Sequence, residues 1–354
     1  MDLDRLDQIL AQFDRKQVLV VGDFFLDRYL VIEESLAERS LETGLDAHQV
    51  VEVRNSPGAA GTVTNNLAAM GASVVAVGVA GDDGEGFELL RGLDATGVDL
   101  DQFVIRGERR TPTYTKPMLR GGDGTLRELN RLDIKNRTPL PREAEDEVIR
   151  ALRGLLPRVH AVIIADQTPE KGCGVITERV RDELSALAQT YGEVAFIADS
   201  RAHIGLFSDV LIKPNAREAL SAVMPDAQWQ GVPDPDWQVD RELIGAAGAR
   251  LYRKNGQPVF LTLGHHGMLV FHADAPTLVP AVPAAGPIDI VGAGDAALAG
   301  IAAALCAGAT AAEAAEVGCL AAGVTVRQIG STGTASRRQM LDLWRERARN
   351  AFVP

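Results

Sequence analysis

A glycine-rich turn that ends in an aspartate is the part of the sequence best suited to chemistry. Residues 289–295 read Asp-Ile-Val-Gly-Ala-Gly-Asp, and a run of Ala, Leu and Gly with helical character follows. The first N–H groups of a helix have no partner within it, and the helix dipole is positive there, so such a turn suits phosphate oxygens. Asp295 could take a proton from a hydroxyl group while these amides hold a transferring phosphoryl group. The pattern predicts phosphoryl transfer to an alcohol, with catalysis by Gly292, Ala293, Gly294 and Asp295.

Two other interpretations fit the same turn. An aspartate in the first turn can simply cap a buried helix through its favourable interaction with the dipole. Residues 292–297 also fit the G-x-G-x-x-A pattern of dinucleotide-binding proteins. That pattern needs a second strand and an acidic residue about 20 positions later. The sequence up to Glu313 and Glu316 instead stays helical in pattern, which disfavours a nicotinamide enzyme.

Further polar residues follow apolar stretches. Asp23 and Asp27 come just after an apolar strand at 17–21, and ionised carboxylates at that end of a sheet accept hydrogen bonds from sugar hydroxyls. A turn and a surface ion pair with Arg28 would explain them too. Asn215 and Glu218 lie one helical turn apart and could help to hold hydrated Mg²⁺, or form only a helix cap.

These residues must be positioned by buried strands that alternate with helices. This alternation predicts an α/β fold with a parallel sheet covered on both faces. Residues 259–271 favour a hairpin at one sheet edge, with a turn at 264–267. The expected helices are 2–13, 60–70, 142–156 and 175–190, and the expected strands are 17–21, 73–79, 161–165 and 194–198.

Two segments break this rhythm. Residues 29–54 and 103–133 contain Val, Ile and Thr-rich runs separated by polar turns, such as the one at 120–124. They predict short antiparallel strands. Both segments leave the sheet near the carboxyl ends of its strands, where ligands bind in open α/β folds, so we expect a lid.

Charge and composition narrow the class of protein. The 36 Lys and Arg against 48 Asp and Glu give a net charge of -12, which disfavours nucleic acid or an anionic membrane as the main partner. A substrate phosphate must therefore meet local cations, for which Lys116, Arg120 and Arg131 are candidates, although exposed charges explain them equally well. The apolar run at 296–309 is shorter than the ~20 residues of a membrane span. With three scattered cysteines and no secretory signal, we expect a cytoplasmic protein.

The segment 289–295 resembles the D-x-x-G-A-G-D signature of the ribokinase-like (PfkB) carbohydrate kinases. Four further motifs of that family resemble segments here, in the same order and over nearly the whole chain. They are the sugar site G-D-x-x-x-D at 22–29, the glycine-rich substrate loop at 57–60, the N-x-x-E motif at 214–218 and the nucleotide-side turn at 264–267.

The resemblance implies a ribokinase-like three-layer sandwich, with a mostly parallel central sheet and a small β-strand lid, formed as one domain by residues 1–354. It implies an ATP-dependent sugar or sugar-phosphate kinase that uses Mg²⁺, in many members with a monovalent cation, and a homodimer paired through the lid. The likeness is greatest to kinases that phosphorylate D-glycero-D-manno-heptose 7-phosphate at O1. A ribose, fructose or nucleoside kinase, or a non-catalytic nucleotide-binding regulator, remains open.

The resemblance also assigns roles by position. The sugar would be bound by Asp23, Asp27, Gly58, Ala59, Thr62, Lys116, Arg120 and Arg131. The nucleotide would be bound by Asn215, Gly264, His266, Gly267 and Ala322, and Mg²⁺ by Asn215 and Glu218. The chain departs from the family pattern at Ala59, where a second Gly is usual, at Thr62 and Cys319, where Asn is usual, and at Val291, where Thr is usual.

Overall fold

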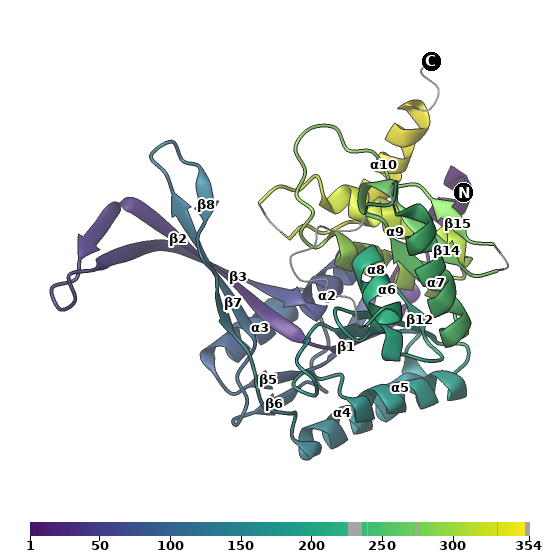
Figure 1. Ribbon diagram of the computed structural model, residues 1–354, viewed down its shortest axis with the longest axis horizontal. Coiled ribbons are helices and arrows are strands. Elements are labelled where there is room, and N and C mark those ends of the chain that lie inside the picture. The colour runs from purple at the N-terminus through teal and green to yellow at the C-terminus, as the bar shows by residue number, and fades with distance from the viewer. Residues whose placement is uncertain (226–235, 239, 274, 331, 351–354) are drawn as a thin grey trace.

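A central eight-stranded sheet forms the middle layer of the protein (Figure 1). The computed structural model describes residues 1–225, 236–238, 240–273, 275–330 and 332–350. Six adjacent strands of this sheet run parallel to one another, and the two strands beyond them at one edge run antiparallel to their neighbours. The mostly parallel sheet and the hairpin are therefore confirmed. The spatial order is β15 (Thr277–Val279), β14 (Met268–Phe271), β13 (Val259–Thr262), β12 (Leu211–Ile212), β11 (Ala195–Ser200), β10 (Ala161–Asp166), β1 (Gln17–Gly22) and β4 (Ser73–Val77).

Helices cover both faces of this sheet because its strands are apolar on both sides. Val18 and Val20 of β1 belong to one buried core, and the intervening Leu19 and Val21 belong to the other. The first core is covered by α1 (Leu3–Leu10), α2 (Ala60–Ala69), α3 (Gly84–Asp94), α8 (Ala293–Cys306), α9 (Ala311–Thr325) and α10 (Arg337–Asn350). The second is covered by α4 (Arg142–Leu155), α5 (Glu178–Thr190), α6 (Ala216–Val223) and α7 (Arg241–Asn255). Within the described ranges, no helix combines the length and apolar character that crossing a membrane requires.

Close packing of α8 on α9 holds the start of α8 in place. A Cβ on Gly300 of α8 would lie only 3.2 Å from the Cβ of Ala321 and from the Cα of Gly318, both on α9. Small residues therefore let the two helix backbones approach each other. Because α8 is Ala-rich and buried nearly all round, its first turn has a rigid support.

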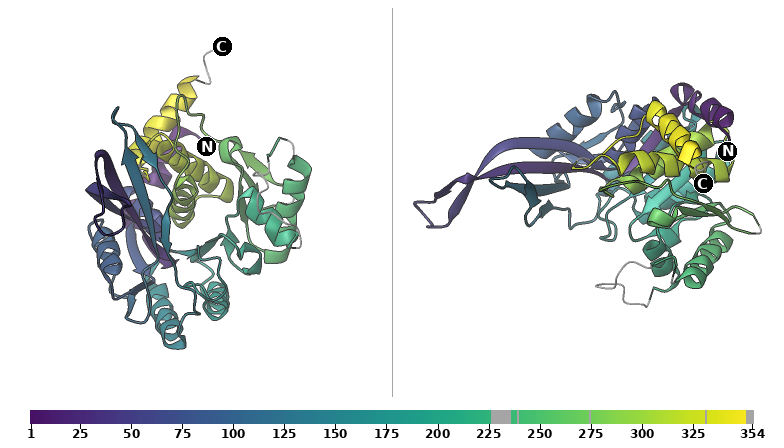
Figure 2. Two further views of the ribbon diagram at one scale, coloured as in Figure 1. Left: turned by 60° about the vertical axis from the view of Figure 1, so that its left-hand side comes forward. Right: turned by 90° about the horizontal axis from the view of Figure 1, so that it is seen from above.

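A second sheet, here called the lid sheet, projects from the body of the protein (Figures 1 and 2). It contains β2 (Phe24–Arg39), β3 (Asp46–Ala59), β7 (Thr113–Arg120), β8 (Leu126–Glu128) and β9 (Leu132–Ile134). β2 and β3 form an antiparallel hairpin, as predicted. The expectation of short, purely antiparallel strands is wrong, because β2 has 16 residues and pairs with β7 in parallel. No glycine or proline interrupts 24–39, and the pairing of β2 with β3 contains register shifts between Val31 and Ile32 and between Glu33 and Glu38.

Two short strands and a sheet edge complete the fold. β5 (Val79–Gly81) and β6 (Val104–Arg106) form a separate parallel pair, so the predicted strand at 73–79 is divided into β4 and β5. β15, which the sequence pattern did not predict, adds an edge strand beyond the hairpin of β13 and β14.

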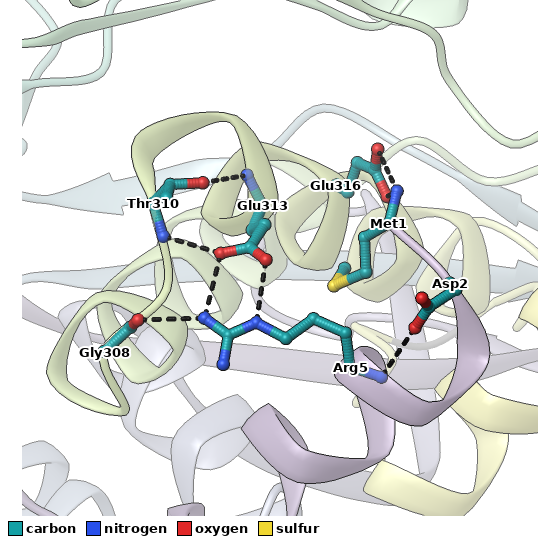
Figure 3. A network of polar contacts seen from close by, with 7 residues as sticks. All are labelled: Met1, Asp2, Arg5, Gly308, Thr310, Glu313 and Glu316. Atoms are coloured by element: carbon teal, nitrogen blue, oxygen red, sulfur yellow. Dashed lines mark hydrogen bonds and ion pairs between the residues drawn. The ribbon is translucent and has the colours of Figure 1, made fainter.

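A polar network ties α1 to the start of α9 (Figure 3). Arg5 Nε donates to Glu313 Oε1 at 2.8 Å, and Glu313 forms a reciprocal capping box with Thr310. The hydrogen bond from Arg5 is the main reason why the pKa of Glu313 is lowered to about 2. The amino group of Met1 lies 3.0 Å from the carboxylate of Glu316. The N-terminal helix therefore braces α9, which in turn packs on α8.

Candidate active site

The turn before α8 presents free backbone amides. Gly292 adopts a left-handed conformation with φ 79°, and a Cβ there would lie 2.8 Å from Thr332 Cγ2, so glycine is required. The first i→i−4 bond of the helix runs from the Ala296 N–H to the Gly292 carbonyl, so the N–H groups of Gly294 and Asp295 precede it. We call residues 292–295 the anion loop.

The side chain of Asp289 holds this loop in place through two hydrogen bonds to the backbone. Its Oδ1 accepts a hydrogen bond from the Val291 N–H at 3.0 Å, and its Oδ2 accepts one from the Gly330 N–H at 3.2 Å. The first aspartate of the motif therefore ties the residue before the loop to the segment that follows α9.

Asp295 stands in the first turn of α8 with a strongly shifted acidity. Burial, and then the charge of Asp199, raise its pKa to about 7, while Lys213 and Arg201 act in the opposite direction. The charge of Asp27, which comes from β2, also raises it, so the two aspartates are near enough to interact. A carboxyl group with a pKa near neutrality is suited to accept a proton from an alcohol.

Asp27 lies at the base of the lid sheet beside two other predicted sugar-site residues, Gly58 and Lys116. Its Oδ1 is 3.1 Å from Lys116 Nζ, which also donates to the Tyr29 hydroxyl at 3.1 Å. A Cβ on Gly58 would lie 2.6 Å from Asp27 Oδ2, so only glycine leaves this carboxylate its place. The structure therefore brings Asp27, Gly58 and Lys116 together.

Asp23 has different surroundings from those that the sequence predicted. Its side chain is buried, and its oxygens accept hydrogen bonds from the N–H groups of Gln167 and Thr168 at 2.8 Å and of Val175 at 2.7 Å. Burial, and then the charge of Asp166, raise its pKa to about 6. Asp23 therefore anchors the segment 167–175, while its predicted role toward a sugar stays a prediction.

The substrate loop meets the anion loop at the start of α2. Ala59 has φ 54° and ψ -118°, a conformation that L-residues rarely adopt, where the family pattern has glycine. Thr62 is buried, and its Cγ2 lies 3.4 Å from the place that a Cβ on Gly292 would take. Ala59 and Thr62 therefore join the predicted sugar site to the anion loop.

The two arginines predicted to bind a substrate phosphate lie at different depths. Arg131 pairs with Asp133 at 2.6 Å and covers the Tyr114 ring at 4.2 Å. Tyr114 is the register partner of Asp27, which places Arg131 at the base of the lid sheet. Arg120 lies farther out and faces two carboxylates, Glu33 at 3.8 Å and Glu52 at 3.6 Å.

A cavity of ≈ 690 Å³ opens beside the anion loop. All five residues predicted to bind the nucleotide line it, together with Ala293 and Gly294 of the loop. These five are Asn215, Gly264, His266, Gly267 and Ala322. Apolar side chains, among them Val282, Ile288 and Ile290, form much of the wall. The arrangement suits a flat apolar group in the cavity and phosphates at the loop.

Asn215 and Glu218 form a reciprocal capping box at the start of α6. The Glu218 N–H donates to Asn215 Oδ1, and the Asn215 N–H donates to Glu218 Oε2, both at 2.8 Å. Burial, and then the charge of Asp199, raise the pKa of Glu218 to about 7. In the part of the chain that the structure describes, no three His, Cys, Asp or Glu side chains gather as metal ligands. Asn215 and Glu218 offer one carboxylate between them, and Mg²⁺, which keeps several waters, needs only one or two carboxylates.

Sequence reasoning missed a buried cation in this region. Lys213 follows β12 directly, and its Nζ lies 3.4 Å from Asp199 Oδ1. The available signal was a lysine at the carboxyl end of an apolar strand, immediately before the Pro214-Asn215 pair.

Asp166, also at the end of its strand, accepts a hydrogen bond from Ser200 Oγ at 2.7 Å.

Comparison with known proteins decides the family. The model of the pfkB family carbohydrate kinases matches residues 15–135 and 206–338. The chain belongs to the PfkB family of carbohydrate kinases. Every predicted site residue lies within the two matched ranges. The family that matches is one of carbohydrate kinases, which are phosphotransferases that act on sugar hydroxyl groups.

Relatives match nearly all of this PfkB chain, and the chain spans about two thirds of their length or slightly less. Bifunctional protein HldE of Pelobacter propionicus is 30% identical over 339 residues, which cover 95% of this chain and 64% of that protein. Bifunctional protein HldE of Desulfatibacillum aliphaticivorans is 29% identical over 333 residues, which cover 94% and 63%.

Solved structures show the same fold. Arabidopsis thaliana ribokinase complexed with ribose and ATP superposes with a TM-score of 0.65 at 20% identity, covering 93% of this chain and 98% of that one. Phosphofructokinase-2 from Escherichia coli in complex with fructose-6-phosphate superposes with a TM-score of 0.66 at 15% identity, covering 94% and 100%. The ribokinase-like fold predicted from the sequence is therefore confirmed.

Proposed function

We propose that this PfkB kinase transfers the γ-phosphoryl group of ATP to the O1 hydroxyl of D-glycero-D-manno-heptose 7-phosphate. One observation carries the proposal for transfer. Asp295 stands at the anion loop, with the nucleotide cavity on one side and the charge of Asp27 near enough to act on it. The likeness to the HldE proteins over nearly the whole chain supports the choice of sugar.

In the proposed reaction, Asp27 accepts hydrogen bonds from sugar hydroxyls and orients the acceptor. Asp295 takes the proton of the attacking hydroxyl, and the amides of the anion loop hold the oxygens of the phosphoryl group in line. Asn215 and Glu218 would help to hold Mg²⁺ through its water shell, and the bound ion would supply positive charge to the phosphates. Closure of the lid sheet would exclude water and so limit hydrolysis of ATP.

The base of the lid sheet offers cations for a phosphate that the sugar already carries. Lys116 and Arg131 lie there, close to Asp27 and to its register partner Tyr114. Arginine matches phosphate oxygens bidentately, and a bound phosphate would compete with Asp133 for Arg131. Arg120, farther out between two glutamates, would contribute less.

We also propose that residues 1–354 act as one kinase domain in the cytoplasm and pair as a homodimer through the lid sheet. The projecting hairpin exposes apolar side chains that a second lid could cover. They are Leu36, Leu41, Leu45, Val50, Val51 and Val53. Light scattering of the protein and of a Val51→Glu variant tests this pairing, and a monomeric parent protein would refute it.

The sugar is tested by a coupled ADP-release screen over heptose 7-phosphate, unphosphorylated heptose, ribose, fructose, fructose 6-phosphate and nucleosides. We expect the highest kcat/KM for heptose 7-phosphate. Arg131→Ala should raise the KM for the phosphorylated sugar by about 10-fold or more, because the substrate would lose a charge-assisted hydrogen bond whose free energy corresponds to roughly that factor. Arg127→Ala, at an exposed arginine of β8, is the control and should change little. A higher kcat/KM for ribose or a nucleoside would refute the proposed sugar.

A further inference from the structure

Arg109 is a buried cation at the point where the lid sheet joins the body of the protein. It precedes β7 and is only 6% exposed, and its guanidinium group donates to the Thr138 carbonyl at 2.8 Å and to the Cys173 carbonyl at 2.6 Å. Thr138 follows β9, so this group links the chain that enters β7 to the chain that leaves β9. Burying a guanidinium group against neutral carbonyls is costly, so its position calls for an explanation.

The segment 167–175, which accepts the hydrogen bond from Arg109, is also held by Asp23. The buried carboxylate of Asp23 accepts hydrogen bonds from three N–H groups of this segment. A Cβ on Gly174 would lie 2.8 Å from Asp23 Oδ1, so only glycine leaves the carboxylate its place. The charge of Asp23 acts on the Arg109 guanidinium group as well. A buried anion therefore binds amides of the segment while a buried cation binds one of its carbonyls, and each offsets the cost of burying the other.

The segment 167–175 packs against the base of the lid sheet. Some of its residues line a small cavity together with Phe25 of β2 and Tyr114 of β7. Glu170 of the segment also pairs at 3.5 Å with Lys135, which follows β9 directly. The segment therefore meets the lid sheet at β2, at β7 and just beyond β9.

These contacts lead directly to Asp27, the predicted sugar ligand. Phe25 precedes Asp27 by two residues, so the alternation of a strand puts both side chains on the same face of β2. Tyr114 is the register partner of Asp27 on β7, and the Phe25 and Tyr114 rings contact each other edge to face with centroids 5.1 Å apart. A shift of the segment would therefore move these two rings, and with them the Asp27 carboxylate.

We propose that Arg109 and Asp23 are positioning residues for sugar binding. They act as a pair of opposite charges that holds the segment 167–175 against the base of the lid sheet, and the segment in turn sets the place of Asp27. The effect on the sugar rests on the proposed function, whereas the hold on the lid sheet does not depend on which sugar is used. Direct contact of Asp23 with a sugar makes a different prediction, because Arg109 would then have no part in sugar binding.

Amide hydrogen exchange of the full chain without ligands tests the hold on the lid sheet. Arg109→Met and Gly174→Ala should each speed exchange about 10-fold or more in the segment 167–175 and also at the base of the lid sheet, residues 24–29 and 113–117. Faster exchange in the segment alone, with the lid base at the parent rate, would overturn the proposal.

Arg106→Met is the matched control, because the Arg106 guanidinium group binds Glu147 of α4 at 3.2 Å instead of the segment. It should leave exchange at the lid base unchanged. Arg109→Lys keeps the charge but not the planar fork that reaches two carbonyls, so it takes the place of Arg109→Met if that variant does not fold.

A double-variant cycle tests the effect on the sugar. It compares Asp23→Asn, Arg109→Met and the double variant in initial-rate kinetics with the sugar that the ADP-release screen identifies. We expect each single variant to lower kcat/KM for the sugar about 10- to 100-fold while the KM for ATP changes less than about 3-fold. The double variant should lose no more than the worse single variant, because no charge is left buried without its partner.

Losses that multiply in the double variant would overturn the proposal, because they would show that Asp23 and Arg109 act independently. An unchanged kcat/KM for the sugar in both single variants would overturn it as well. If the screen identifies no sugar, the proposed function fails, and the exchange measurement still decides whether the pair holds the lid sheet.

Discussion

Replacing Ala59 by glycine should stabilise the protein. Ala59 is held at φ 54° and ψ -118°, and such a conformation costs an L-residue about 1–3 kcal/mol. Glycine removes that cost but gives back roughly 0.5–1 kcal/mol through the greater freedom of the unfolded chain. The Ala59 side chain is only partly buried, so little packing is lost. The expected net gain is about 1 kcal/mol.

Urea denaturation measures this gain as a higher midpoint with an unchanged slope. Ala68→Gly, in the helix α2 that follows Ala59 and with helical conformation, is the matched control. It should destabilise the protein by roughly 0.5–1 kcal/mol. If Ala59→Gly were as destabilising as Ala68→Gly, the argument for strain at Ala59 would be wrong.

Two further predictions concern the sugar site and the N-terminal brace. Gly58→Ala should raise the KM for the sugar about 10-fold or more and leave nucleotide affinity unchanged, because the new Cβ would lie 2.6 Å from Asp27 Oδ2. Initial-rate kinetics and nucleotide titration check this prediction. An unaltered KM for the sugar would contradict it. Glu313 has a pKa of about 2 in the folded protein against an ordinary value of 4.5, so it stabilises the fold above about pH 5, and this contribution is lost as the pH falls towards 2. Arg5→Ala should make stability depend less on pH over that range, as urea midpoints at several pH values would show; an equally steep dependence would exclude this pair as its source.

Much of the central sheet could be predicted because its strands are apolar on both faces. Such runs differ clearly from the amphipathic helices between them, so β1, β10 and β11 were found with nearly their observed bounds. The lid sheet was harder to predict. β2 and β3 are largely exposed beyond their base, so burial imposes no clear alternation that would mark their lengths. β15 is a three-residue edge strand with two exposed positions, which leaves almost no pattern to read.

The candidate site was predictable where a motif fixes backbone geometry. The anion loop needs glycine at 292, and the turn at 264–267 follows from its place in a hairpin, so both were found. Partners that come from distant segments were not predictable. The sequence does not show that the segment 167–175 returns to occupy the oxygens of Asp23. Nor does it show that Lys213 meets Asp199 beside Gly294, because that contact depends on the order of strands in the sheet.

The central claim is that Asp295 takes the proton from the sugar hydroxyl. The most direct test is the pre-steady-state rate of phosphoryl transfer by Asp295→Asn, with nucleotide and sugar both saturating. We expect a loss of about 10²–10⁴-fold with nucleotide affinity nearly unchanged. In the parent protein, kcat/KM should fall about tenfold per pH unit below about pH 7, since only the ionised carboxylate can accept the proton. An Asp295→Asn protein that transfers the phosphoryl group at the parent rate would contradict the claim.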